Sequence, residues 1–284
     1  LSYDIRNGDA LHDGVANEYL RRARAPGVPS QMEIESARLY RNNRNGTFTD
    51  VTREQGLADK AIFAIGHNFG DLDNDGWLDF YVGTGGPDLR SIIPNRMFRS
   101  VEGRRFEEVS MEGGFANIQK GHGTAFADLD RDGDEDIYMV LGGAYQGDVF
   151  TNVLYENPGW PRNGWITFAL EGRTANRSAI GARVAIDVIR ANGQPRTLHR
   201  TVGTSGSFGA GSLELHVGLG DATRVERVRI AWPDRARSVT AHTGFALRAS
   251  YRIVQGEQPL LLARPPVPFS KMPQLQRLEM PVRR

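Results

Sequence analysis

The chain has no cysteine among its 284 residues. This absence excludes disulfide scaffolds, thiolate metal sites and cysteine nucleophiles. The sequence also has no run of 18 apolar residues, so we expect no membrane span. Neither sign of charge dominates, because 35 basic and 34 acidic residues leave a net charge of +1. We therefore expect no nucleic acid among the partners.

Common catalytic and nucleotide-binding motifs are missing as well. Residues 203–207, Gly-Thr-Ser-Gly-Ser, are not a nucleophile elbow, which requires glycine two positions before and two positions after the serine. Residues 218–220 lack the third glycine of a dinucleotide fingerprint, and the chain has neither a Walker loop nor a His-Glu-x-x-His zinc motif. The sequence therefore indicates no catalytic residues and no organic cofactor.

The acidic residues that stand out lie in two segments of the same pattern. Residues 71–79 read Asp-Leu-Asp-Asn-Asp-Gly-Trp-Leu-Asp, and residues 128–136 read Asp-Leu-Asp-Arg-Asp-Gly-Asp-Glu-Asp. Carboxylates at alternate positions of a tight loop can converge on one centre, and the glycine at position 6 permits the sharp turn between them. Such a set of hard oxygen donors suits Ca²⁺, which takes 6–8 oxygen ligands.

We predict two Ca²⁺ sites, although two acidic hairpin turns are the simpler alternative. Neither segment is an EF-hand, because position 12 is Val82 or Met139 instead of glutamate and the flanking residues are typical of strands. The predicted ligands are the carboxylates at positions 1, 3, 5 and 9 and the main-chain carbonyl at position 7: Asp71, Asp73, Asp75, Asp79 and Trp77 in the first loop, and Asp128, Asp130, Asp132, Asp136 and Asp134 in the second.

The segments around the acidic loops repeat. Residues 39–42, Leu-Tyr-Arg-Asn, are followed 58 residues later by Met-Phe-Arg-Ser at 97–100, and the acidic loops lie 57 residues apart. Each unit reads as two strands, a connection, and two more strands joined by the acidic loop. Four strands in a fixed period are typical of a propeller blade. A third copy begins at residue 153 and ends at the Pro158-Gly159-Trp160-Pro161 segment.

Residues 163–254 also have the pattern of strands. Apolar and polar residues alternate with a period of two at 165–170, 182–189, 213–217 and 225–232. Asn192-Gly193 is a strong signal for a hairpin turn. We therefore expect a small β-sandwich or an open barrel.

Two families resemble these segments. The Leu-Tyr-Arg-Asn, Gly-Thr-Phe-Thr-Asp-Val-Thr and Asp-Leu-Asp-Asn-Asp-Gly strings resemble the FG-GAP/VCBS repeat of integrin-like and cartilage-acidic-protein-like propellers. Residues 172–184, 203–207, 216–220 and 228–233 are similar to the ASPIC/UnbV domain. The resemblance implies all-β FG-GAP-type propeller blades, in an incomplete or divergent propeller, followed by a small β-domain. Only two acidic loops are visible, whereas propellers usually close with four or more blades.

The predicted division follows these signals. Residues 1–38 form a helix or a divergent blade, 39–157 hold the repeats and the calcium loops, 158–256 are the ASPIC/UnbV-like domain, and 257–284 are a proline-rich arm. The arm lies on the body of the protein or on a neighbouring subunit, where it could support an oligomer. The chain starts at Leu1 instead of methionine, so we expect an upstream segment such as a signal peptide to have been removed.

These features favour a calcium-stabilised binding or adhesion scaffold that is secreted, periplasmic or on the cell surface, with a protein or glycan partner. Two alternatives remain open. One is an UnbV-like enzyme or accessory protein of natural-product biosynthesis, which depends on the resemblance alone. The other is a structural subunit of an extracellular assembly. A polar pocket between the two domains would favour the enzyme.

Overall fold

The computed structural model describes residues 38–58, 60, 64–85, 93–143, 151–203, 206 and 208–271. Within these residues the regular structure is β-strand, apart from one 3-10 turn, η1 (Phe269–Lys271). This confirms the all-β fold class predicted from the sequence. The helix or divergent blade expected at residues 1–38 lies outside the described residues except for Arg38.

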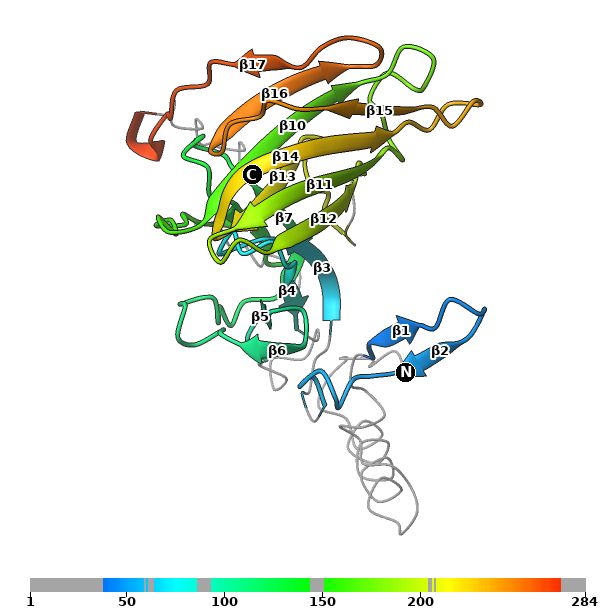
Figure 1. Cartoon of the computed structure of the whole chain (residues 1–284). Coiled ribbons are helices and arrows are strands. Elements are labelled where there is room, and N and C mark those ends of the chain that lie inside the picture. The colour runs from blue at the N-terminus through cyan, green and yellow to red at the C-terminus, as the bar shows by residue number, and fades with distance from the viewer. Residues whose placement is uncertain are drawn as a thin grey trace, which may run out of the picture.

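Three small antiparallel sheets form the first part of the chain (Figure 1). Their orders are β1-β2, β3-β4-β5-β6 and β7-β8-β9. The strands are β1 (Tyr40–Asn42), β2 (Phe48–Asp50), β3 (Ala64–Gly70), β4 (Asp79–Thr84), β5 (Arg96–Val101), β6 (Arg105–Glu108), β7 (Gly121–Ala127), β8 (Asp136–Leu141) and β9 (Val153–Tyr155). Their propeller-like arrangement confirms the prediction of FG-GAP-type blades.

The boundaries of the sheets do not coincide with those of the sequence repeats: each of the two larger sheets joins the second half of one repeat to the first strands of the next. The sheet β3-β4-β5-β6 starts with the hairpin around the first acidic loop and ends with the opening hairpin of the next repeat. Phe80 of β4 is therefore paired in register with Phe98 of β5. In the same way β9, which opens the third copy, pairs with β8. Each of these two sheets thus takes strands from two successive repeats, which ties the repeats together.

The two larger blades share a buried core. Tyr81, Met97 and Met139 are fully buried between the sheets, together with Ile137. Apolar side chains of this size remove a large area from water, which stabilises the contact between blades. Gly70 also allows the inner strands to lie close, because a Cβ atom at this position would lie 2.1 Å from the ring of Phe126.

Two four-stranded sheets of the orders β13-β10-β16-β17 and β12-β11-β14-β15 pack face to face in the second part of the chain (Figure 1). Their strands are β10 (Gly164–Glu171), β11 (Arg183–Arg190), β12 (Pro195–Thr201), β13 (Leu215–Gly220), β14 (Ala222–Ala231), β15 (Val239–His242), β16 (Ala249–Val254) and β17 (Leu260–Leu262). Alternate residues point into one shared core, as the period-two pattern predicts. The expected hairpin joins β11 to β12, with Gly193 at φ 78°. The small β-sandwich is therefore confirmed.

The described part of the C-terminal arm lies on this same chain. β17 pairs with β16 in the sandwich. Beyond β17, both terminal nitrogens of the Arg264 guanidinium donate to the Glu214 carboxylate, at 2.5 and 2.7 Å. The main-chain N–H of Val267 then donates to the carbonyl of Asp130 in the second acidic loop, at 2.6 Å. The arm thereby links the sandwich to the blades.

The sandwich docks directly on the first acidic loop. The Gly220 N–H donates to the carbonyl of Asn74 at 2.8 Å, and the Asn163 amide donates to the carbonyl of Asp73 at 2.6 Å. Gly218 lies so close to the loop that a Cβ atom there would be 2.5 Å from the Asn74 backbone. The acidic loop is therefore part of the contact between the two domains.

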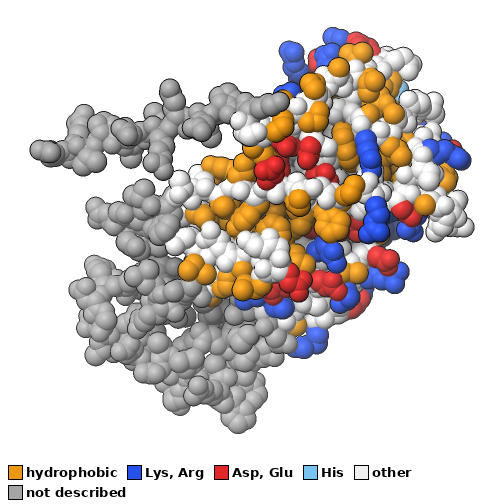
Figure 2. Space-filling model, turned by 90° about the vertical axis from the view of Figure 1, so that its left-hand side faces the viewer, with side chains coloured by type: hydrophobic (Ala, Val, Ile, Leu, Met, Phe, Trp, Pro, Cys, Tyr) orange, Lys and Arg blue, Asp and Glu red, His pale blue; other side chains and the backbone are white. Residues whose placement is uncertain are grey.

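The surface is mixed in charge. On the face in Figure 2, basic and acidic side chains are interspersed around a band of hydrophobic ones. Among the helical segments that the structure describes, none has the length and apolar character needed to cross a membrane.

The close contact between Gly218 and the first acidic loop predicts the effect of a substitution on stability. We expect Gly218→Ala to lower the free energy of unfolding by about 1–3 kcal/mol, because the added methyl group overpacks the contact with Asn74 and Asp71. Gly203→Ala is the matched control, since nothing lies within 4 Å of a Cβ atom at that position. Urea unfolding of both variants measures the difference. Equal stability of the two variants would show that the domains do not pack in this way.

Candidate metal centres

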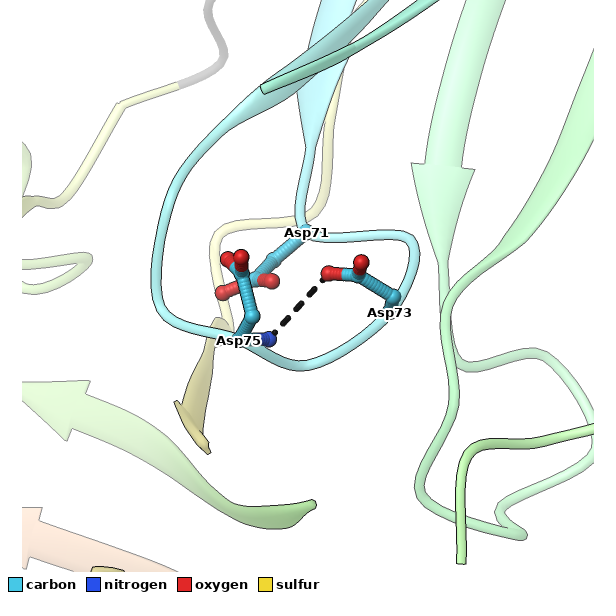
Figure 3. Close-up of side chains that lie close together, drawn as sticks. All are labelled: Asp71, Asp73 and Asp75. Atoms are coloured by element: carbon cyan, nitrogen blue, oxygen red, sulfur yellow. Dashed lines mark hydrogen bonds between the residues drawn. The ribbon is translucent and has the colours of Figure 1, made fainter. Parts of the chain in front are cut away.

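The first acidic loop connects β3 to β4, and the carboxylates of Asp71, Asp73 and Asp75 point toward one another inside it (Figure 3). One carboxylate oxygen from each of Asp71, Asp73 and Asp75 lies within 4.8 Å of the other two. The backbone makes this convergence possible through two left-handed residues, Asn74 at φ 56° and Gly76 at φ 90°. The Asp75 N–H donates to Asp73 Oδ1 at 3.3 Å, which closes the turn.

The second acidic loop connects β7 to β8 and has the same construction. Asp128, Asp130 and Asp132 bring one oxygen each within 4.8 Å of the others. Arg131 and Gly133 are left-handed, with φ of 64° and 98°, at the same loop positions as Asn74 and Gly76. The structure therefore brings together the aspartates at positions 1, 3 and 5 of both loops, as the sequence predicts.

The aspartate at position 9 closes each loop. Asp79 accepts the N–H of Leu72 at 2.8 Å and the N–H of Ser100 at 2.7 Å. Asp136 accepts the equivalent N–H groups of Leu129 and Asn157, both at 3.0 Å. Asp79 thus ties its loop to β5, the first strand of the next repeat, and Asp136 ties its loop to the segment just after β9. Neither belongs to the groups of three converging carboxylates, so their direct coordination of a metal stays a prediction.

The residues at position 7, Trp77 and Asp134, form hydrogen bonds through their main-chain N–H groups, and Asp134 also through its carboxylate. The N–H groups of Trp77 and Asp134 donate to Asp75 Oδ1 and Asp132 Oδ1, at 2.8 and 2.9 Å. The Asp134 carboxylate accepts from the Asn74 amide at 2.8 Å, which joins the two acidic loops. Coordination by the carbonyls of Trp77 and Asp134 stays a prediction.

Burial makes the first acidic loop electrostatically unfavourable in its ionised form. The pKa of Asp71 is raised to about 8, mainly by burial; the Arg200 guanidinium partly offsets this rise, and the neighbouring Asp75, Glu135 and Asp73 add to it. Burial likewise raises the pKa of Asp79 to about 9 and that of Asp75 to about 6. A bound cation would stabilise the ionised carboxylates and relieve this cost.

Burial also disfavours ionised carboxylates in the second loop, but the pKa shifts are smaller there. Burial raises the pKa of Asp128 and that of Asp136 to about 6. Asp128 Oδ1 is buried and has no hydrogen-bond partner. Glu135, at position 8, is half-buried and accepts the Asp71 N–H at 2.7 Å, and the loss of solvent around its carboxyl raises its pKa to about 7. The hard oxygen donors, their convergence and the unpaired Asp128 oxygen all fit a divalent cation such as Ca²⁺.

Side chains from the sandwich complete the first site, and the sequence pattern did not reveal them. Arg200 of β12 donates to Asp71 Oδ2 at 3.1 Å, and the Gly218 N–H donates to the same oxygen at 3.1 Å. Arg196 donates to the carbonyl of Asp75 at 2.7 Å and stacks over the Trp77 ring, 4.7 Å from its centroid. These residues lie more than 100 positions from the loop, so no local spacing could identify them.

Family models match both parts of the chain. Residues 30–82 match the FG-GAP-like repeat, and this segment includes the first acidic loop. Residues 172–260 match the ASPIC and UnbV domain, and this segment contains strands β11 to β16 of the sandwich. No curated protein matches the chain. The matches confirm the resemblance proposed from the sequence, with an FG-GAP-like repeat followed by an ASPIC/UnbV domain.

The raised pKa values predict an unusual pH dependence for the metal-free protein. Asp71, Asp79 and Glu135 have higher pKa values in the native state than in the unfolded chain. Between the two values, the native protein binds more protons than the unfolded chain does. Their contribution to stability is therefore present at low pH and is lost as the pH rises towards 9. We expect the melting temperature in EDTA to fall from pH 6.5 to pH 8.5.

This interval avoids an opposing contribution from His216. Burial lowers the pKa of His216 to about 3, so this residue makes stability rise with pH only below about pH 6.5. The variant Asp71→Asn should show a flatter pH dependence, because the asparagine does not titrate. A melting temperature that rises with pH in the metal-free wild type would contradict the prediction.

Proposed function

We propose that the chain is an extracellular binding scaffold in which two Ca²⁺ ions rigidify the acidic loops. The observation that supports this proposal is the pair of three-aspartate groups, which have the same geometry at the same position of two repeats. Each loop concentrates carboxylates that are costly to bury as free anions. Filling both loops with calcium stabilises the strands on either side, so metal binding contributes directly to folding.

In the first loop, calcium would also affect the contact between the domains. The loop backbone accepts hydrogen bonds from Asn163, Arg196 and Gly220 of the sandwich. A rigid loop keeps these acceptors in place, so the ion holds the blades and the ASPIC/UnbV domain in one orientation. A fixed orientation suits a protein that presents a composite surface to a partner, because less conformational freedom is lost on binding. Calcium at extracellular concentrations can keep even a weak site filled.

A second candidate function is that of an enzyme or accessory protein acting on a small molecule. The observation that favours it is a polar cleft of about 400 Å³ between the second acidic loop and the sandwich. His216 lines this cleft, but both of its ring nitrogens contact protein groups: Nε2 lies 2.7 Å from Asn74 Oδ1 and Nδ1 lies 3.3 Å from Thr167 Oγ1. Because this histidine is held by its neighbours, a binding role is favoured over general base catalysis.

Calcium titration tests the proposed scaffold. We expect the melting temperature of EDTA-treated protein to rise by about 10–20 °C in excess CaCl₂. This shift corresponds to about 2.7 kcal/mol of stabilisation from each of the two ions at a concentration 100 times Kd. Isothermal titration calorimetry should give two ions per chain. The variants Asp73→Asn and Asp130→Asn should each bind one ion fewer.

The matched control is Asp221→Asn, which changes an exposed aspartate in the turn between β13 and β14 and should still bind two ions. MgCl₂ serves as the second control, because Mg²⁺ prefers octahedral sites with several waters and should stabilise less. Identical melting curves in EDTA and in CaCl₂ would rule out the calcium sites.

A further inference from the structure

The cleft between the domains is lined by charged side chains of the second acidic loop and by aromatic and polar side chains of the sandwich. Asp128, Arg131 and Glu135 line it from the second acidic loop, and Trp165 and Ser250 line it from β10 and β16 of the sandwich. Its volume of about 400 Å³ lies within the range of small-molecule sites. Because the two domains each supply part of the lining, the site exists only when they are docked.

One part of the lining is an indole ring held in a fixed orientation. Trp165 stacks on His216, with ring centroids 5.9 Å apart and an interplanar angle of 29°. Gly133 allows this position, because a Cβ atom there would lie 2.0 Å from the indole. His216 is itself fixed by Asn74 and Thr167. The half-buried indole therefore offers the cleft a rigid apolar surface.

The polar groups of the lining carry both signs of charge and can form many hydrogen bonds. Asp128, Glu135 and Glu214 are acidic, and Arg131 and Arg264 are basic. Glu214 and Arg264 neutralise each other in a two-pronged ion pair. Ser212 accepts the Glu214 N–H through its hydroxyl oxygen, so its O–H remains able to donate. Ser250 contributes a second hydroxyl. This lining offers many donors and acceptors but no dominant charge.

We propose that this cleft binds a neutral saccharide unit. A pyranose ring has one face of C–H groups, which can lie against an indole. Its hydroxyl groups both donate and accept hydrogen bonds, so they can bind carboxylate, guanidinium and serine groups together. A strongly charged ligand would leave one sign of the lining charges unbalanced. This inference rests on the proposed binding role, for which it specifies a saccharide as the partner and the cleft as the binding site. It does not require calcium to be bound.

The test measures binding of defined sugars to the whole chain. Saturation-transfer NMR screens the methyl glycosides of glucose, galactose, mannose and N-acetylglucosamine, with lactose and cellobiose, and calorimetry then measures Kd for those that bind. We expect at least one to bind with a Kd below about 10 mM. Ser250→Leu should weaken this binding at least about tenfold by filling the cleft, while the control Ser178→Leu, at an exposed site in the β10–β11 loop, leaves it unchanged.

A second pair of variants keeps the test valid if Ser250→Leu does not fold. Glu214→Gln removes the charge that pairs with Arg264 inside the cleft, whereas Glu226→Gln changes an exposed glutamate of β14. Only the first should weaken sugar binding. Each titration is made in CaCl₂ and in EDTA, so that loss of the calcium sites is distinguishable from loss of the sugar site.

Three results would overturn the proposal. The first is that no sugar of the panel binds below about 10 mM in either buffer. The second is that citrate or spermine binds the cleft more tightly than any neutral sugar, which would assign it to a charged ligand. The third is that a sugar binds equally well to the wild type, Ser250→Leu and Glu214→Gln, which would place the sugar elsewhere on the protein.

Discussion

Burial of carboxylates at the contact between two β-domains is the constraint on which the rest of this structure depends. Asp71 is only 1% exposed, because the Gly218 backbone and the Arg200 guanidinium of the sandwich cover it. Three arginines, Arg200, Arg99 and Arg196, act on this loop. They do not balance its five carboxylates, which are Asp71, Asp73, Asp75, Asp79 and Glu135. The excess of buried negative charge is costly unless the groups hold protons or a metal ion. It therefore links the packing of the domains to what the loop binds.

The two acidic loops are built alike but differ in their surroundings. The first is enclosed by β12 and β13 of the sandwich, and its carboxylates have the larger pKa shifts. The second faces the cleft, where Asp128 is half-buried and the C-terminal arm crosses the loop at Val267. The same sequence pattern thus stiffens the domain contact in one copy and borders a small-molecule-sized space in the other. Only the second copy lines the proposed binding cleft.

The offset between repeat and sheet links the loops along the chain. Asp79 bonds to Ser100, and Asp136 bonds to Asn157, in each case across the boundary to the next repeat. Asn157 also donates to the carbonyl of Leu72, so the end of the second blade reaches back to the first acidic loop. A change in either loop therefore acts on strands of two repeats at once. Such links make a single well-defined arrangement possible with few blades.

The sequence by itself determined the β-strands, the two acidic loops with converging aspartates, and the succession of repeats and a sandwich. These features depend on local rules: alternation of apolar side chains, glycine at left-handed positions such as Gly76 and Gly133, and carboxylates spaced two residues apart. Only the tertiary structure decided that Arg200, Gly218 and Glu135 surround Asp71, or that Trp165 and Ser250 face the second loop across a cleft. These contacts join residues 32 or more positions apart in the sequence. They follow from how the domains dock, which no local pattern encodes.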